Sequence, residues 1–183
     1  MEIYIIRHTS VAVPKGTCYG QYDVELADSF FDEVKDYQKK IPQTFDAIYS
    51  SPLKRCTALA GQMSNNISVD ERLLEMNFGD WEMKHWNDIP EEESINWSEH
   101  FDVISPPHGE TFQEVYDRVF DFYQNLKQNQ QYDKVLIVTH AGIIRCFWAI
   151  ILELKLKNAF KIPINFGEIL VLDSKYDLIK QKA

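Results

Sequence analysis

Short runs of apolar residues alternate along this chain with longer segments of helical periodicity. Residues 3–6 read Ile-Tyr-Ile-Ile and residues 135–138 read Val-Leu-Ile-Val. Such runs are too short for buried helices and are rich in β-branched side chains, as is typical of strands inside a sheet. The runs at 45–50, 67–69 and 168–172 predict three further strands.

Helical patterns lie between these runs. Apolar residues recur at helical spacing over residues 30–41, and the pattern ends before Pro42. Ser51 as N-cap and Pro52 at the first helical position predict the start of a second helix. The apolar stretch from Gly142 predicts a buried helix, well short of the roughly 20 residues that span a bilayer.

Thr111 and Glu114 predict a capping box at the start of a long helix. The residues expected on its buried face are Phe112, Val115, Tyr116, Val119, Phe120, Tyr123 and Leu126. Because strands and helices alternate, the chain is predicted to form a three-layer α/β/α sandwich with a largely parallel central sheet. One domain, residues 1–183, is expected at this length.

The periodicity lapses from Glu82 to His108. Trp86, Trp97 and Phe101 lie in this stretch with a run of three glutamates. Long segments of this kind are commonly functional, and the aromatic residues favour an ordered one. We therefore expect a lid insertion at 82–108, whose aromatic side chains either offer a surface to substrate or only anchor the segment to the domain.

Charge and cysteine content exclude several classes of function. The net charge of −9 argues against a nucleic-acid or anionic-membrane surface, which requires an excess of Lys and Arg. Cys18, Cys56 and Cys146 are odd in number and have no short paired spacing, so neither a disulfide framework nor a zinc site is predicted. A reduced cytoplasmic compartment fits this usage, and Arg7 lies where a signal peptide would need its apolar core. The oligomeric state is not readable from the sequence.

The candidate chemistry lies at two strand ends. Arg7 and His8 follow the first apolar run, and Thr139 and His140 follow the run at 135–138. Ligands of open α/β sheets bind at the carboxyl ends of the strands. If both strands are central and parallel, the two histidines face each other across one pocket, although a lone histidine at a strand end is more often a core residue.

Two further charged residues are candidates on local grounds. Arg55 falls in the first turn of a predicted helix, where the helix dipole disfavours a cation. Such an arginine is either solvated or directed at a dianion. Glu75 lies between apolar residues, where desolvation favours the neutral carboxylic acid and makes it a possible proton donor. The alternative is a surface glutamate on a turn.

Weaker signals come from three other positions. Gly20 and Gln21 lie in a glycine-containing loop that could bring backbone amides to an anion or could be a surface turn. Glu110 either orders the site or satisfies backbone at a helix start. His108, just before it, either contacts substrate or is merely exposed.

Five motifs occur in the order seen in the histidine phosphatase superfamily, which has the phosphoglycerate-mutase-like fold. They are Arg7-His8-Thr9, 51–55 (Ser-Pro-Leu-Lys-Arg), 74–82 (Leu-Glu, then Phe-Gly-Asp-Trp-Glu), Gly109-Glu110 and 139–142 (Thr-His-Ala-Gly). Together they cover the chain nearly end to end, so the sequence resembles this superfamily closely. The loop at 16–23 is most similar to that of α-ribazole phosphatases of cobalamin synthesis. Thr9 replaces the usual glycine, and we expect an ordinary backbone there.

The resemblance implies a phosphatase that needs neither metal nor cofactor and acts on a small phosphate monoester. His8 would attack phosphorus to give a phosphohistidine. Arg7 and Arg55 would bind the phosphate and disfavour the imidazolium form of His8. His140 would donate to a phosphate oxygen, and Glu75 would protonate the leaving group and then activate water.

The leading substrate on this resemblance is α-ribazole 5′-phosphate. A phosphoglycerate mutase or a broad sugar-phosphate phosphatase would use the same groups. From other classes, we considered a metallohydrolase with His8 and His140 as ligands, and an inactive phosphate-binding module. The sequence has no His-x-x-x-His motif or Asp cluster to support the first, and the presence of every catalytic group disfavours the second.

Overall fold

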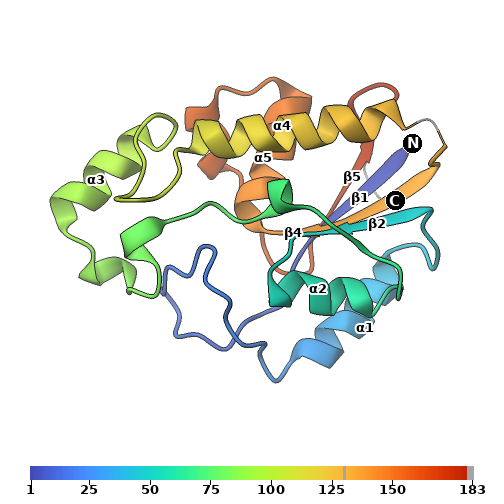
Figure 1. Cartoon of the computed structure of the whole chain (residues 1–183), viewed down its shortest axis with the longest axis horizontal. Helices are drawn as coiled ribbons and strands as arrows, with labels where there is room; N and C mark the ends of the chain where they lie inside the picture. Colours follow the sequence, from blue (N-terminus) through green and yellow to red (C-terminus); the bar gives the residue numbers. More distant parts are fainter. Residues whose placement is uncertain (130, 181–183) are drawn as a thin grey trace.

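The computed structural model describes residues 1–129 and 131–180, and it confirms the predicted α/β class. Figure 1 shows a central twisted sheet with helices on both of its faces. The strands are β1 (Glu2–Arg7), β2 (Ala47–Ser50), β3 (Ser68–Val69), β4 (Lys134–Thr139), β5 (Ile169–Asp173) and β6 (Leu178–Ile179). Their spatial order is β3-β2-β4-β1-β5-β6.

The strands that carry the site are parallel. β1 pairs with β4, and β2 pairs with both β4 and β3, in parallel. Of the strands formed by residues 1–129 and 131–180, only β5 and β6 run antiparallel, β5 beside β1 and β6 beside β5. The expectation of a largely parallel sheet with β1 and β4 at its centre is therefore confirmed.

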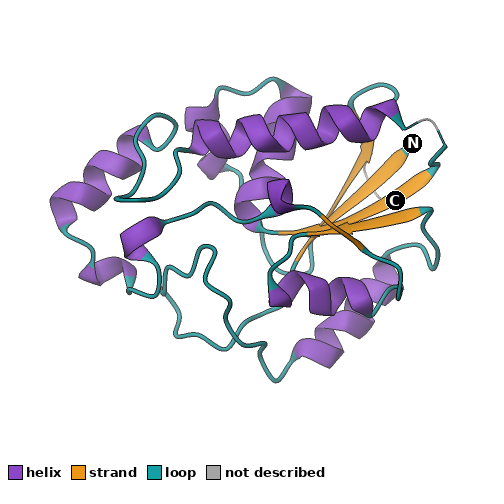
Figure 2. Ribbon diagram, viewed as in Figure 1, coloured by secondary structure: helices purple, strands orange, loops and turns teal. Residues whose placement is uncertain are grey.

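Helices lie on both faces of the sheet and extend beyond it (Figure 2). The α-helices among the described residues are α1 (Phe30–Lys40), α2 (Lys54–Gly61), α3 (Glu91–His100), α4 (Phe112–Gln128) and α5 (Ala141–Leu152). The 3₁₀ segments are η1 (Glu71–Leu73), η2 (Gly79–Trp81), η3 (Trp86–Asp88) and η4 (Leu156–Lys161). No helix in this part of the chain is long and apolar enough to cross a membrane.

Alternate residues of each central strand enter two separate cores. Ile3 and Ile5 of β1 pack in the core that α4 and α5 cover, whereas Ile6 packs in the core that α1 and α2 cover. This period of two is what a strand buried on both faces requires. The two cores give the sheet the middle layer of a three-layer sandwich.

Two local helix predictions are wrong in detail. α2 begins at Lys54 with Leu53 as N-cap, so Ser51 does not cap it. On α4 the capping box of Thr111 and Glu114 is present, but Phe120 is exposed and Phe122 is buried in its place. Val115, Phe122 and their neighbours recur every three or four residues, which places Phe120 on the opposite side of the helix.

The segment at 82–108 contains α3 and is held to the domain by its aromatic residues. Trp97 and Phe101 are buried in the core shared with α4 and α5, and Trp86 stacks on Trp97 with 5.8 Å between ring centroids. α3 lies at the far left of Figure 1, beyond the end of α4. Trp97 and Phe101 thus do the anchoring, which was one of the two roles left open by the sequence.

Candidate active site

The register of β1 on β4 brings the two strand-end histidines together. Arg7 lies opposite Thr139, and the backbone N–H of His8 donates to the Thr139 carbonyl at 2.9 Å. His8 and His140 therefore leave the sheet side by side, with 5.1 Å between ring centroids. The expectation that they are neighbours is confirmed, and both are buried.

Arg7 and Arg55 flank His8 without a counter-charge. Arg7 donates from Nη1 to the Ile164 carbonyl at 2.9 Å, and the fully buried Arg55 donates to the carbonyls of Tyr22 at 2.8 Å and Gly20 at 2.6 Å. Within the described residues, neither has a carboxylate within 4.0 Å, and the buried Nε of each has no hydrogen-bond partner. A buried and a half-buried cation without an anion define an anion site.

His8 is held in the tautomer that a nucleophile needs. Its Nδ1 lies 2.7 Å from the carbonyl oxygen of Thr9, and because a carbonyl can only accept, Nδ1 carries the proton and the lone pair of Nε2 is free. Burial, then the charges of Arg55 and Arg7, hold the pKa of His8 well below its usual value. His8 is therefore neutral at neutral pH.

His140 is neutral for the same reasons. Its pKa is lowered well below the usual value by burial first, and then by His8 and the nearby arginines. Its Nε2 is hydrogen-bonded to the Ser51 hydroxyl at 2.7 Å, and Nδ1 has only a 3.9 Å contact with Sγ of Cys56. Ser51, which the sequence suggested as a helix cap, thus orients the second histidine.

The Glu75 carboxylate contacts the first turn of α5, the helix that begins directly after His140. Its Oε2 accepts from the backbone N–H of Gly142 at 3.3 Å, and its Oε1 accepts from the N–H of Met76 at 3.0 Å. A side chain at position 142 would clash with this carboxylate. Gly142 therefore permits the close approach that places a carboxylate at the positive end of the helix.

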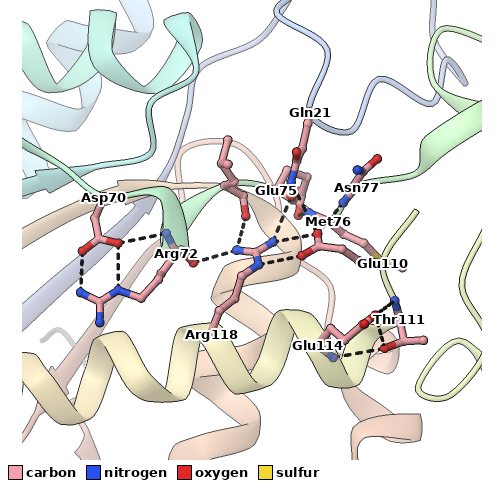
Figure 3. A network of polar contacts seen from close by, with 11 residues as sticks. Gln21, Asp70, Arg72, Glu75, Met76, Asn77, Glu110, Thr111, Glu114 and Arg118 are labelled. Atoms are coloured by element: carbon pink, nitrogen blue, oxygen red, sulfur yellow. Dashed lines mark hydrogen bonds and ion pairs between the residues drawn. The ribbon is translucent and has the colours of Figure 1, made fainter. Parts of the chain in front are cut away.

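Arg118 on α4 organises the loop that carries Glu75, as Figure 3 shows. It donates to the backbone carbonyls of Leu74 at 2.8 Å and Glu75 at 3.1 Å, and to that of Arg72 at 2.7 Å. Its Nε and Nη2 also contact both carboxylate oxygens of Glu110, at 3.0 and 3.1 Å. The signal that could have revealed this residue is an arginine within the apolar face of the α4 pattern.

Glu110 and the 16–23 loop are placed around this network. The second oxygen of Glu110 also accepts from the N–H of Asn77 at 2.8 Å, so this carboxylate orders the Glu75 loop. Gln21 donates from Nε2 to the Glu75 carbonyl at 2.8 Å. Gly20 has φ of +38°, and its carbonyl oxygen accepts a hydrogen bond from the Arg55 guanidinium. The loop therefore presents a carbonyl oxygen to this side chain.

Two unusual residues of the motifs have simple placements. Thr9 is buried and does not have a positive φ, as expected from its β-branched side chain. His108 has φ of +58° and an exposed ring whose Nδ1 lies 3.0 Å from Asp80. Among the described residues, no group of three or more His, Cys, Asp or Glu side chains could hold a metal ion.

The chain belongs to the histidine phosphatase superfamily (branch 1), whose family model matches residues 3–180. It is therefore a phosphatase of the class that acts on small phosphate monoesters. It is 28% identical over 153 residues to the adenosylcobalamin/α-ribazole phosphatase of Escherichia coli K12, covering 79% of this chain and 75% of that one. It is 27% identical over 167 residues to phosphoserine phosphatase 1 of Hydrogenobacter thermophilus, covering 86% and 79%.

A solved structure shows the same fold. The crystal structure of the α-ribazole phosphatase from Shigella flexneri matches with a TM-score of 0.87 at 24% sequence identity, covering 100% of this chain and 95% of that chain. The phosphoglycerate-mutase-like fold expected from the five motifs is thus confirmed.

The neutral histidines predict how stability depends on pH. The unfolded chain binds protons at histidine near pH 6.5, whereas folded His8 does so only at much lower pH. The free energy of unfolding therefore falls as the pH drops below about 6.5, by up to about 1.4 kcal/mol per pH unit for each such histidine. Urea unfolding of His8→Gln between pH 7 and pH 5 is expected to show a smaller decrease than wild type; an identical decrease would contradict a neutral buried His8.

The Arg118 network predicts a large loss of stability. Arg118→Met leaves Glu110 without its cation and leaves the backbone carbonyls of Arg72 and Leu74 without this donor, so the free energy of unfolding is expected to fall by about 2–4 kcal/mol. Lys39→Met is the control, because Lys39 pairs with Asp36 and both side chains are exposed, so its loss of stability should be much smaller. Urea unfolding of both variants checks this prediction. Equal losses of unfolding free energy would show that Arg118 stabilises the fold no more than the control residue does.

Proposed function

We propose that this protein hydrolyses small phosphate monoesters through a phosphohistidine intermediate on His8, without a metal ion. The observation that carries the proposal is that the buried Arg55 and the half-buried Arg7 have no carboxylate partner among the described residues and lie beside a neutral histidine. A phosphate dianion supplies the charge that these cations lack. The same cations keep the nucleophile unprotonated.

In the first step, the lone pair on Nε2 of His8 attacks phosphorus in line with the ester oxygen. The P–N bond forms as the P–O bond breaks, and Glu75 gives its proton to the departing oxygen, so that an alcohol leaves. Arg7 and Arg55 bind the phosphoryl oxygens, and His140 donates to one of them from the nitrogen that Ser51 does not occupy. Charge in phosphoryl transfer is stabilised by donors fixed in this way.

In the second step, water replaces the alcohol. Glu75, now ionised, takes a proton from the water as its oxygen attacks phosphorus, and the P–N bond breaks. Inorganic phosphate leaves, and His8 and Glu75 return to their starting forms. The contact of Glu75 with Gly142 keeps its carboxylate beside the histidines for both steps.

Two substrates are candidates. α-Ribazole 5′-phosphate is supported by the 16–23 loop and by the name of the Escherichia coli relative, and it would place the enzyme in cobalamin synthesis. Phosphoserine is supported by the name of the Hydrogenobacter thermophilus relative and by the position of Arg145 on α5. A phosphoglycerate mutase would use the same groups. We also propose a cytoplasmic location, in keeping with three free cysteines.

The covalent intermediate gives a direct test. Wild-type protein mixed with ³²P-labelled monoester and quenched in alkali is expected to retain label that is stable to base and labile to acid. His8→Ala should retain none and should lose at least about a thousandfold in kcat, because the nucleophile is gone. Peptide mapping of the label checks the assignment, and label on any residue other than His8 would refute it.

The role of Glu75 is tested with leaving groups of different basicity. A general acid contributes roughly 10²–10⁴-fold when the leaving alcohol is a poor one. Glu75→Gln is therefore expected to slow an alkyl phosphate by that factor and p-nitrophenyl phosphate by less than about tenfold, since nitrophenolate needs little protonation. Steady-state kcat values for the two esters decide the matter, and equal losses would assign Glu75 a structural role.

A further inference from the structure

The five arginines of this chain fall into two groups. Arg72 pairs with Asp70 and Asp121, and Arg118 pairs with Glu110. The other three, which are Arg7, Arg55 and Arg145, have no carboxylate within 4.0 Å among the described residues. The phosphate accounts for two of them, and Arg145 has no part in the mechanism above.

Arg145 is a fixed, half-buried guanidinium on α5. Its Nε donates to the carbonyl of Ile162 at 3.0 Å, and its guanidinium carbon lies 4.9 Å from the ring centroid of Phe160. Its two terminal nitrogens have no acceptor in the described chain. A guanidinium held on one edge in this way has its planar fork free for a bidentate anion.

Two contacts place Arg145 between the phosphate-binding arginine and the proton donor. The carbonyls that hold Arg145 and Arg7 belong to Ile162 and Ile164, two residues apart in one segment. Gly142, which contacts the Glu75 carboxylate, lies one helical turn before Arg145 on α5, and residues three apart lie on one side of a helix. In the proposed mechanism Glu75 protonates the leaving alcohol, so the alcohol would lie on this side of the site.

The charge of Arg145 is costly where it lies. Burial lowers the pKa of Arg145, and the nearby Arg7 acts in the same direction against the opposing attraction of Glu75. When Glu75 is protonated, as the proposed first step requires, its attraction is absent, and a partly buried cation near a second cation then favours an additional anion. Its position therefore calls for an anionic group on the substrate in addition to the phosphate.

We infer that Arg145 binds a carboxylate on the alcohol part of the substrate. The inference rests on the proposed function. The substrate class is then a phosphate monoester of a hydroxy acid. O-Phosphoserine belongs to this class, whereas α-ribazole 5′-phosphate carries no anionic group on its alcohol part.

A matched pair of substrates tests the inference on the wild-type protein. O-Phosphoserine and O-phosphoethanolamine share the phosphate, the ester carbon and the ammonium group, and differ by the carboxylate. A charge-assisted bidentate contact is expected to favour phosphoserine by about ten- to a hundred-fold in kcat/KM. Equal kcat/KM values for the pair would overturn the inference without any variant.

Variants then assign the preference to Arg145. Arg145→Gln is expected to lose about ten- to a hundred-fold in kcat/KM on phosphoserine, mainly through KM, and less than threefold on phosphoethanolamine. Arg145→Lys keeps the charge without the fork and should recover part of the loss. Lys157→Gln, which removes an exposed cation from η4, is the control for net charge and should match wild type on both substrates.

The outcomes separate this inference from the proposed function. Equal losses on both substrates in Arg145→Gln, or no loss on either, would overturn the carboxylate site and leave the packing of Arg145 on Phe160 as its role. Wild-type protein that forms no phosphohistidine with any monoester would overturn the proposed function itself. A wild-type preference for α-ribazole 5′-phosphate over phosphoserine would refute the inference while the phosphohistidine mechanism stood.

Discussion

The placement of a buried guanidinium, Arg55, beside a half-buried one, Arg7, without a counter-ion is the constraint on which the rest of this structure depends. Removing an ion from water costs several kcal/mol even after relaxation, and the carbonyls of Gly20, Tyr22 and Ile164 offset only part of that cost for Arg55 and Arg7. The chain carries a net charge of −9. The protein is acidic overall, yet in the described part of the chain its carboxylates make no ion pair with Arg7 or Arg55.

The neutral histidines follow from the same field. Burial together with the neighbouring arginines depresses the pKa of both His8 and His140. The Thr9 carbonyl then selects the His8 tautomer, and Ser51 engages one nitrogen of His140. Phosphate binding and a free nucleophilic lone pair are therefore two consequences of one arrangement, which is why no metal ion is needed in the proposed mechanism.

A proton donor must stay near these cations without neutralising them. Glu75 is kept in place by the amide of Gly142 at the start of α5, and its loop is tied through backbone carbonyls to Arg118. Glu110 pairs with Arg118 and so holds it for this task. Glu75 is thus positioned through main-chain contacts, whereas Arg118 forms its ion pair with Glu110.

The sequence by itself determined strands β1 to β5, helices α1, α2, α4 and α5, and the two strand-end histidines, but it did not predict α3, whose segment lacks helical periodicity, or the two-residue strand β6. Apolar runs and helical periods are local properties, since they report which face of an element is buried. The tertiary structure alone decided that Ser51 contacts His140 instead of capping α2, and that Arg118 reaches the Glu75 loop. These facts depend on which polar group lies across from another in the packed chain, and such pairings join residues dozens of positions apart that no local pattern connects.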